Sequence, residues 1–310
     1  IHHFYRVNDC EILPELLKNI FKKLKSIFEN RHITHLKDLD KEAFSIIETF
    51  TLDKLIREEL TSEVNALIEI IYELDVYISM AKSIKAYNLC FPQFINSKNP
   101  YIKINGAFHL FVSKPVPNNI EFSDENNFMF LTGPNMAGKT TFLKTCGVSI
   151  YLAHLGIGVP AENMQLTLFD GILTSINTND NLSAGHSYYY SEVKKVKDIA
   201  LTIITGKRFF VIFDELFKGT NVEDAYECSN LVISGLTNWK NSIFILSSHL
   251  IELEKELRKY KNISFNYFCS EVEQRVPVFD FKLKKGVSKQ RLGKLILENE
   301  EIINILNPVP

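Results

Sequence analysis

The sequence lacks the features that mark disulfide-rich, disordered or membrane-spanning proteins. Its five cysteines are an odd number, widely spaced and without a C-x-x-C pair, which argues against a disulfide framework or a zinc site and for the reducing cytoplasm. Only 13 glycines and 10 prolines occur, without a low-complexity tract, so disorder is not expected. No apolar run reaches the roughly 18 residues of a membrane span, and we expect no membrane contact.

A basic excess, which nucleic-acid-binding proteins usually show, is also lacking. The net charge is −2 and the isoelectric point is near 6.5. Most basic runs are solvated faces, so contact with DNA stays open. The local basic groups are Lys18, Lys22, Lys23, Lys25, Lys282, Lys284, Lys285, Lys289, Arg291 and Lys294. The chain starts at Ile1 rather than Met, and we expect it to be the ordered part of something longer.

The first 95 residues read as an all-α helical segment. Apolar residues at steps of three and four predict one helix face, formed by Leu13, Leu16, Ile20, Leu24 and Ile27. After Ser62, a predicted N-cap, a second set repeats with heptad spacing at Leu67, Ile71, Leu74, Ile78 and Ala81. We expect a long helix here that Pro92 stops.

From about Tyr101 onward, short apolar runs alternate with helical patterns. The runs are NFMFL (127–131), RFFVIF (208–213) and SIFIL (242–246), and each precedes a predicted helix. Strands that are apolar on both faces and alternate with helices indicate a parallel sheet covered by helices. The end of the chain, VPVFDFKLKKG followed by LGKLILENEEIINIL, reads as a strand and then a helix. We therefore expect a helical segment at 1–95 and an α/β domain at 96–310.

Residues 131–142, LTGPNMAGKTTF, fit the phosphate-loop pattern G-x-x-x-x-G-K-[ST]. The glycines let backbone N–H groups turn inward around phosphate oxygens, and the following helix presents its positive end. Lys139 would reach the β- and γ-phosphates, and Thr140 would ligate Mg²⁺. We expect ATP to be bound by the whole loop: Gly133, Pro134, Asn135, Met136, Ala137, Gly138, Lys139, Thr140 and Thr141.

Phosphoryl transfer also needs groups that hold the metal and place an attacking water. Asp214 and Glu215 follow a buried strand, at the sheet edge where ligands bind in open α/β folds. We expect Asp214 to hold Mg²⁺ with Thr140, and Glu215 to polarise the water. His249 follows the next strand and can hydrogen-bond the γ-phosphate. The predicted catalytic residues are thus Glu215, His249 and Lys139.

Together these patterns resemble the ATPase domain of the MutS mismatch-repair family, within the wider ABC class. The resemblance lies in the loop with its Asn-Met pair and in three segments after it: GVPAENMQLTLFDGILTSINTNDNLSAGHSYYYSEV (158–193), DELFKGTNVEDA (214–225) and SSHLIELEKEL (247–257). Upstream, YELDVYISMAKSIKAYNLCFPQF (72–94) looks like the helix that joins the family's core to the ATPase. The resemblance implies an α/β P-loop ATPase domain of the ABC type with a mainly parallel sheet, preceded by the all-α segment.

The resemblance also implies a composite site, in which each of two ATPase domains supplies a serine to the other's γ-phosphate. The family's Gly-x-Ser position is Ser187, which we prefer. The likeness of LSAGH to the LSGGQ of ABC transporters keeps Ser183 open. Glu192 stands at the family's acidic position. By family position Phe281 could stack on the adenine, and Val116 sits where an aromatic is more usual.

The function that the resemblance implies is that of an ATP- and Mg²⁺-dependent motor, acting as a homodimer, with mismatched or branched DNA as a plausible partner. The family's mismatch-reading domain has no counterpart in these residues. One alternative is a nucleotide-gated dimerisation module of a shortened relative that acts on a protein. Another is a transporter or chromosome-maintenance ATPase of the ABC class. Asn135-Met136 and Val159-Pro160-Ala161 fit the MutS pattern better than the patterns of those proteins.

Overall fold

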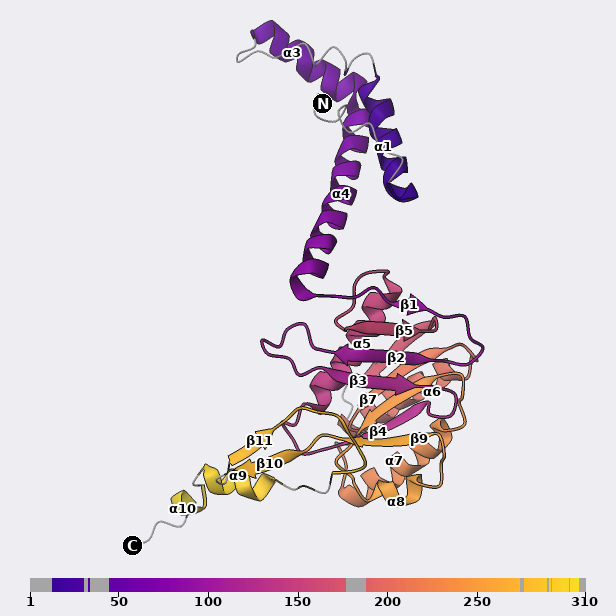
Figure 1. Cartoon of the computed structure of the whole chain (residues 1–310), viewed down its shortest axis with the longest axis vertical. Coiled ribbons are helices and arrows are strands. Elements are labelled where there is room, and N and C mark those ends of the chain that lie inside the picture. Colours follow the sequence, from indigo (N-terminus) through magenta and orange to yellow (C-terminus); the bar gives the residue numbers. More distant parts are fainter. Residues whose placement is uncertain are drawn as a thin grey trace. The chain divides into compact units, whose positions relative to one another are not determined.

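The computed structural model describes residues 13–30, 33, 45–176, 188–273, 276–288, 290, 292–300 and 302–306 of the 310-residue chain (Figure 1). The chain divides into two compact units, Ile1–Ser83 and Ile84–Pro310, and each is considered by itself. Within the described residues, no helix combines the length and the apolar composition that a membrane crossing requires.

The described elements of the first unit are helical. They are α1 (Glu15–Phe28), α3 (Ile46–Lys54), the π-helix η3 (Leu55–Glu59) and α4 (Thr61–Tyr87). The buried core is formed by Ile20 and Leu24 of α1 and Ile70 of α4. The predicted faces are therefore wrong in part: Leu16 is 53% exposed and Ile71 is 60% exposed. On α4 the packed residues are Leu67, Ile70, Leu74 and Tyr77. Ile70 and Tyr77 thus take the places that the heptad pattern gave to Ile71 and Ile78.

The residues predicted to start and to stop α4, Ser62 and Pro92, are both wrong. The helix begins at Thr61, so Ser62 lies inside it and is not the N-cap. The hydroxyl of Ser62 donates to Glu63 at 2.5 Å instead of accepting from a backbone amide. At the other end, Asn88 adopts a left-handed φ of 51°, and Leu89 N–H donates to the carbonyl of Ile84 at 2.9 Å. Asn88, not Pro92, thus ends the helix.

The second unit is a mixed α/β fold, and its largest sheet has six strands in the order β12-β9-β4-β8-β7-β6. The strands are β4 (Phe128–Thr132), β6 (Gly171–Ser175), β7 (Phe209–Asp214), β8 (Ile243–Ser247), β9 (Ile263–Tyr267) and β12 (Lys284–Lys285). All pairings in this sheet are parallel except that of β12 with β9. Every residue of β4, β7 and β8 is buried, which agrees with the apolar runs predicted as strands.

Helices cover both faces of this sheet. The helices are α5 (Lys139–His154), α6 (Tyr188–Ile203), α7 (Val222–Leu236) and α8 (Leu253–Leu257). Because side chains alternate along a strand, Met129 and Leu131 of β4 pack in the cluster that contains α5. Phe128 and Phe130 pack on the other face, in the cluster that contains α6, α7 and α8.

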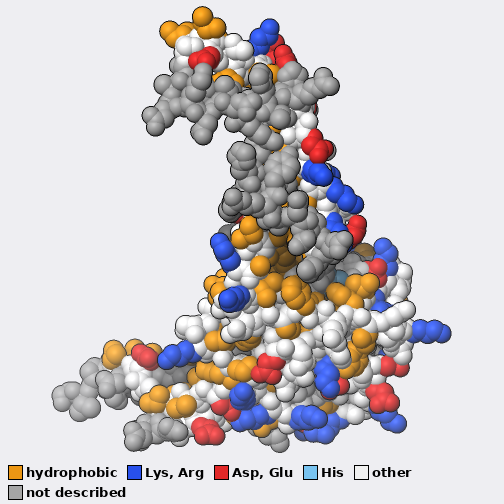
Figure 2. Space-filling model, turned by 45° about the horizontal axis from the view of Figure 1, so that its top comes forward, with side chains coloured by type: hydrophobic (Ala, Val, Ile, Leu, Met, Phe, Trp, Pro, Cys, Tyr) orange, Lys and Arg blue, Asp and Glu red, His pale blue; other side chains and the backbone are white. Residues whose placement is uncertain are grey.

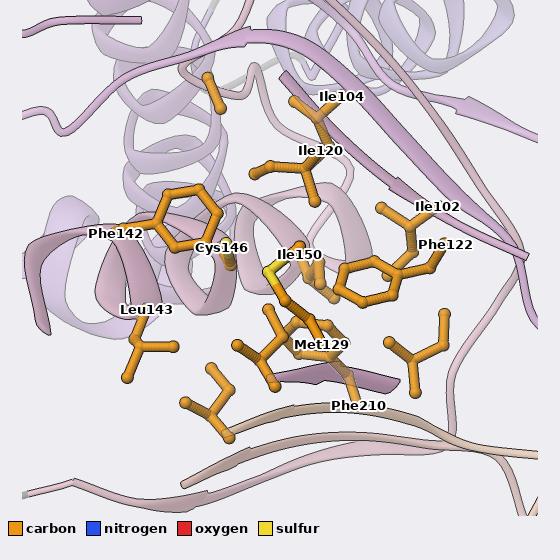
Figure 3. Packing of buried hydrophobic residues seen from close by; sticks show 14 of the residues in the cluster. Ile102, Ile104, Ile120, Phe122, Met129, Phe142, Leu143, Cys146, Ile150 and Phe210 are labelled. Atoms are coloured by element: carbon orange, nitrogen blue, oxygen red, sulfur yellow. The ribbon is translucent and has the colours of Figure 1, made fainter. Parts of the chain in front are cut away.

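A second sheet, which the sequence did not predict, has the order β1-β5-β2-β3. Its strands are β1 (Gln93–Phe94), β2 (Ile102–Ala107), β3 (Asn118–Phe122) and β5 (Asn163–Leu166). Figure 3 shows Phe142, Cys146 and Ile150 of α5 pointing toward the Ile and Phe side chains of β2 and β3. A spacing of four places these three residues on one helix face. Since α5 contacts β2 as well as β7 and β8, the helix after the phosphate loop is held by both sheets.

The C-terminal part differs from its prediction. The expected strand is divided into β11 (Val276–Phe279), which pairs with β10 (Ser270–Glu273), and β12. Between β11 and β12, Phe281 has a left-handed φ of 52°, which is incompatible with a continuous strand. The expected helix appears as α9 (Gly293–Asn299) and α10 (Ile302–Leu306).

Candidate active site

The phosphate loop (133–138) joins the end of β4 to the start of α5. Gly133 and Gly138 have φ values of 148° and 95°. A Cβ at Gly133 would lie 2.8 Å from the carbonyl oxygen of Phe268, and one at Gly138 would lie 3.2 Å from the ring of Phe281. Gly133 therefore needs glycine for both conformation and space, whereas Gly138 needs it for its conformation. Met136, with a φ of 67°, takes a left-handed backbone although it is not glycine.

Lys139 is buried at the start of α5, with 6% of its surface exposed. Its Nζ donates to the carbonyls of Gly133 at 2.8 Å and Pro134 at 3.2 Å, and lies 3.8 Å from Oε1 of Glu215. Burial lowers the pKa of Lys139, and the charges of Glu215 and Asp214 oppose that shift. The backbone of the phosphate loop thus binds the ammonium group of Lys139.

Thr140 and Asp214, the two residues expected to hold Mg²⁺, are in direct contact. The Thr140 hydroxyl donates to Oδ2 of Asp214 at 2.7 Å, and the hydroxyl of Ser247 donates to Oδ1 at 2.5 Å. Within the described residues, no group of three His, Cys, Asp or Glu side chains could hold a metal alone. An oxygen-only pair of this kind fits Mg²⁺, which one or two carboxylates and substrate phosphates usually hold in phosphate sites.

Glu215 follows Asp214 and has a left-handed φ of 62°. Three basic side chains lie close to its carboxylate. Its Oε2 lies 3.3 Å from Nδ1 of His249 and 3.2 Å from Nζ of Lys218, and Lys139 approaches Oε1. Burial alone raises the pKa of Glu215, but the hydrogen bond and charge of His249 and the charges of Lys218 and Lys139 outweigh it. The result is a pKa lowered to about 2. The structure thus brings Lys139, Glu215 and His249 together and adds Lys218, which sequence reasoning missed.

Two cavities flank the phosphate loop. A cavity of about 300 Å³ is lined by Met136, Ala137, Gly138 and Thr141 of the loop region together with Val116 and Phe281. A second cavity of about 320 Å³ is lined by Gly133, Pro134 and Asn135 together with His249. The predicted base-contacting residues, Val116 and Phe281, therefore share one cavity although they are far apart in sequence.

Asn118, at the start of β3, ties the two walls of the first cavity together. Its Nδ2 donates to the carbonyl of Phe281 at 2.9 Å and to that of Val116 at 3.2 Å. Its Oδ1 accepts from the N–H of Leu283 at 2.7 Å. Sequence reasoning missed Asn118, because no local pattern signals a contact across 165 positions.

The serines expected to act in trans, Ser183 and Ser187, lie outside the described residues. The helix that follows them, α6, carries Glu192, which is buried with 5% exposure. Oε2 of Glu192 accepts from the N–H of Gly219, in the loop after β7, at 3.2 Å. Glu192, which stands at the family's acidic position, is thus hydrogen-bonded to the loop that begins with Glu215.

Comparison with known protein families gives the family of this chain. Residues 129–304 match the model of MutS domain V, and the chain therefore belongs to the MutS family. It is 30% identical over 267 residues to the DNA mismatch repair protein MutS of Lysinibacillus sphaericus, covering 82% of this chain and 30% of that protein. The corresponding protein of Petrotoga mobilis is 30% identical over 262 residues, covering 82% and 32%. That of Fervidobacterium nodosum is 29% identical over 297 residues, covering 88% and 35%. The chain thus spans about a third of the length of these relatives.

Proposed function

We propose that this chain binds ATP with Mg²⁺ and hydrolyses it, as the motor part of a MutS-family mismatch-repair protein. The observation that carries the proposal is the meeting of Lys139, Thr140, Asp214, Glu215 and His249 at the ends of β4, β7 and β8. The parallel neighbours β4, β8 and β7 support an assignment of residues 96–310 to the ABC type of α/β P-loop ATPases. In this proposal residues 1–95 are the helical segment that precedes the ATPase domain, and their last residues include strand β1 of the second unit.

The triphosphate would bind along the phosphate loop, at the positive end of α5. Lys139 would then turn from the carbonyls of Gly133 and Pro134 toward the β- and γ-phosphate oxygens. The base would enter the cavity between Val116 and Phe281, where apolar contact rather than close hydrogen bonding would hold it.

Thr140 and Asp214 would hold Mg²⁺, and their oxygens already converge. When bound, Mg²⁺ neutralises the charge that develops on the phosphates. The contact from Ser247 keeps the Asp214 carboxylate oriented for that role.

Glu215 would orient and polarise the attacking water. Its pKa of about 2 keeps it ionised at neutral pH but makes it a weak base. If Lys139 and His249 turn toward the γ-phosphate, two of the three side chains that lower this pKa move away, and Glu215 becomes more basic. Nucleotide binding would thereby switch on the carboxylate that hydrolysis needs.

The complete site would form between two copies of the chain, with Ser187 of one copy meeting the γ-phosphate of the other. A serine just before a helix suits this role, because its hydroxyl and the helix dipole both favour an anion. The partner serine would add a hydrogen bond that neither copy has alone. This arrangement predicts ATP-dependent pairing of two chains.

DNA enters the proposal as a partner through the names of the relatives. The relatives are named DNA mismatch repair proteins, but the chain spans only about a third of their length. On the face shown in Figure 2, Lys and Arg side chains are interspersed with Asp and Glu. A protein partner therefore remains the alternative outcome of the test.

The test has two stages. ATP binding and hydrolysis by the chain come first, since failure of either would contradict the motor function. Fluorescence anisotropy of the full-length protein on perfect, mismatched and branched duplexes, with and without ATP at one stated salt concentration, then tests DNA. Tight, ATP-sensitive, structure-selective binding supports the repair role. No binding at low salt removes that role and points to a protein partner.

A further inference from the structure

Glu192 of α6 is a buried carboxylate whose partners lie in the loop after β7. Oε2 of Glu192 accepts from the N–H of Gly219 at 3.2 Å. Burial raises the pKa of Glu192, and the backbone N–H groups and charge of the Lys218–Gly219 segment oppose the shift. Because a buried carboxylate is stable only when hydrogen-bonded, this contact restricts where the loop can lie.

The loop needs such support because its backbone is strained. Glu215 and Phe217 have left-handed φ values of 62° and 58°, which non-glycine residues keep only when their surroundings hold them. Tyr189 of α6 packs against the ring of Phe217, with 5.8 Å between the ring centroids. The hydroxyl of Tyr189 lies 3.4 Å from Sγ of Cys228 in α7. α6 therefore holds the loop at two points.

Lys218 connects this support to the candidate catalytic group. Glu192 holds the adjacent residue Gly219 through its backbone N–H, while Nζ of Lys218 lies 3.2 Å from Oε2 of Glu215. We propose that Glu192 is a positioning residue, which keeps Glu215 directed at the phosphate site by holding the backbone of Gly219, the neighbour of Lys218. The inference rests on the proposed ATPase function for its kinetic consequence. Its structural consequence, the fixed loop, does not depend on turnover.

The kinetic test compares Glu192→Ala and Glu192→Gln with the unmodified chain. Removal of the acceptor in Glu192→Ala lets Glu215 drift, and misplacement on the scale of an ångström lowers kcat by about 10- to 100-fold. The Kd for ATP stays within about twofold, because no contact of Glu192 reaches the phosphate loop in the described residues. Glu192→Gln keeps a carbonyl acceptor for Gly219 and retains most of kcat.

Ile199→Val is the matched control for a merely structural effect. Ile199 is also on α6 and is buried, with 3% exposure, so the loss of a methyl group there weakens the packing of the same helix. This variant should lose stability and keep its kcat. A kcat in Glu192→Ala equal to that of the unmodified chain, or an equal loss in Ile199→Val, overturns the proposal.

Hydrogen exchange tests the same contact without turnover. In Glu192→Ala, we expect the amides of Gly219 and Glu215 to exchange about tenfold faster or more, as the loop opens locally. Amides in the middle of α7, such as Ile233, should keep their rates. Unchanged exchange at Glu215 overturns the positioning role even in a chain that does not hydrolyse ATP. Absence of turnover in the unmodified chain contradicts the proposed function instead, so the two failures are distinct.

Discussion

The hydroxyl of Thr140 donates a 2.7 Å hydrogen bond to Asp214, 74 positions further along the chain. The two residues meet because β4 and β7 both pair with β8, so the start of α5 and the end of β7 lie at one edge of the sheet. Ser247, opposite Asp214 in the β7–β8 register, donates to the other carboxylate oxygen. Both oxygens of Asp214 are therefore fixed by neighbouring elements, which orients the carboxylate before any metal binds.

Replacement of the loop lysine should remove nucleotide binding. In Lys139→Ala the charged donor for the β- and γ-phosphates is gone, and each such bond contributes about 1.5–3 kcal/mol. We expect ATP affinity to fall by about 10²-fold or more, as measured by isothermal titration calorimetry. Lys144→Ala, an exposed lysine of the same helix, should bind normally. Equal loss in both variants would indicate a general charge effect and not a loop contact.

Glu215→Gln should bind ATP and stall hydrolysis. The amide keeps the shape of the side chain but cannot accept a proton from water, and loss of a general base lowers turnover by about 10²- to 10⁴-fold. Steady-state phosphate release and nucleotide binding measured on the same sample separate the two effects. Glu223→Gln, an exposed carboxylate in the first turn of α7, serves as the control. Unchanged turnover in Glu215→Gln would remove the role assigned to this residue.

The lowered pKa of Glu215 also predicts how stability depends on pH. The folded-state pKa lies below its ordinary value of 4.5, at about 2, so the ionised carboxylate stabilises the fold above pH 4.5. That contribution is lost as the pH falls from about 4.5 to about 2. At about 1.4 kcal/mol per pKa unit it amounts to about 3 kcal/mol.

Urea unfolding of the unmodified chain and of Glu215→Gln at several pH values measures this contribution. The difference between their free energies of unfolding isolates Glu215 from the other carboxylates. It should be largest near neutral pH and shrink between pH 4.5 and about 2. A difference that stays constant over this range would show that His249, Lys218 and Lys139 do not hold the Glu215 carboxylate in solution.

The trans role of the serine predicts a variant that pairs and binds but does not turn over. In Ser187→Ala one hydrogen bond to the developing charge is lost, and such losses lower kcat by about 10²- to 10³-fold. Light scattering with ATP measures pairing, and phosphate release measures turnover. Ser183→Ala is the decisive comparison, because the opposite pattern would assign the role to Ser183. A monomer at all ATP concentrations would count against any composite site.

Asn118→Ala should weaken binding of the base but not of the phosphates. The substitution removes the bonds that hold Val116, Phe281 and Leu283 together, and the cavity wall loses its fixed position. We expect ATP to bind about tenfold more weakly, which corresponds to about 1.4 kcal/mol. Inorganic triphosphate should bind with unchanged affinity. Asn119→Ala is the control, since Asn119 bonds to Gly106 instead.

The sequence predicted the strands and the phosphate loop because their signals are local. Strands β4, β7 and β8 are buried on both faces and stay apolar throughout, and the loop needs glycines at fixed positions. The sheet β1-β5-β2-β3 escaped prediction, because its strands mix buried and exposed residues and pair across long stretches of chain. The sequence predicted that α4 ends before Pro92, and it does, but the residue that ends the helix is Asn88 with its left-handed backbone.

Within the site, residue types were predictable and contacts were not. The phosphate-loop pattern named Lys139, and the end of an apolar strand named Asp214 and Glu215. They did not reveal that Lys218 would point back to Glu215, or that Asn118 would bridge to the segment around Phe281. The contact of Lys218 depends on the left-handed backbone of the loop after β7, and the contact of Asn118 joins residues far apart in the sequence. Neither produces a periodic pattern of residues that could be recognised in the sequence.

The position of α6 has a consequence for cooperativity. This helix contacts the Glu215 loop of its own chain, and it directly follows the serine proposed to serve the other chain's nucleotide. In a pair of chains, one rigid element would then take part in both ATP sites. Because coupling free energies are reciprocal, ATP at either site would change the affinity of the other by the same factor. ATP titrations of the paired chains would depart from a single hyperbola.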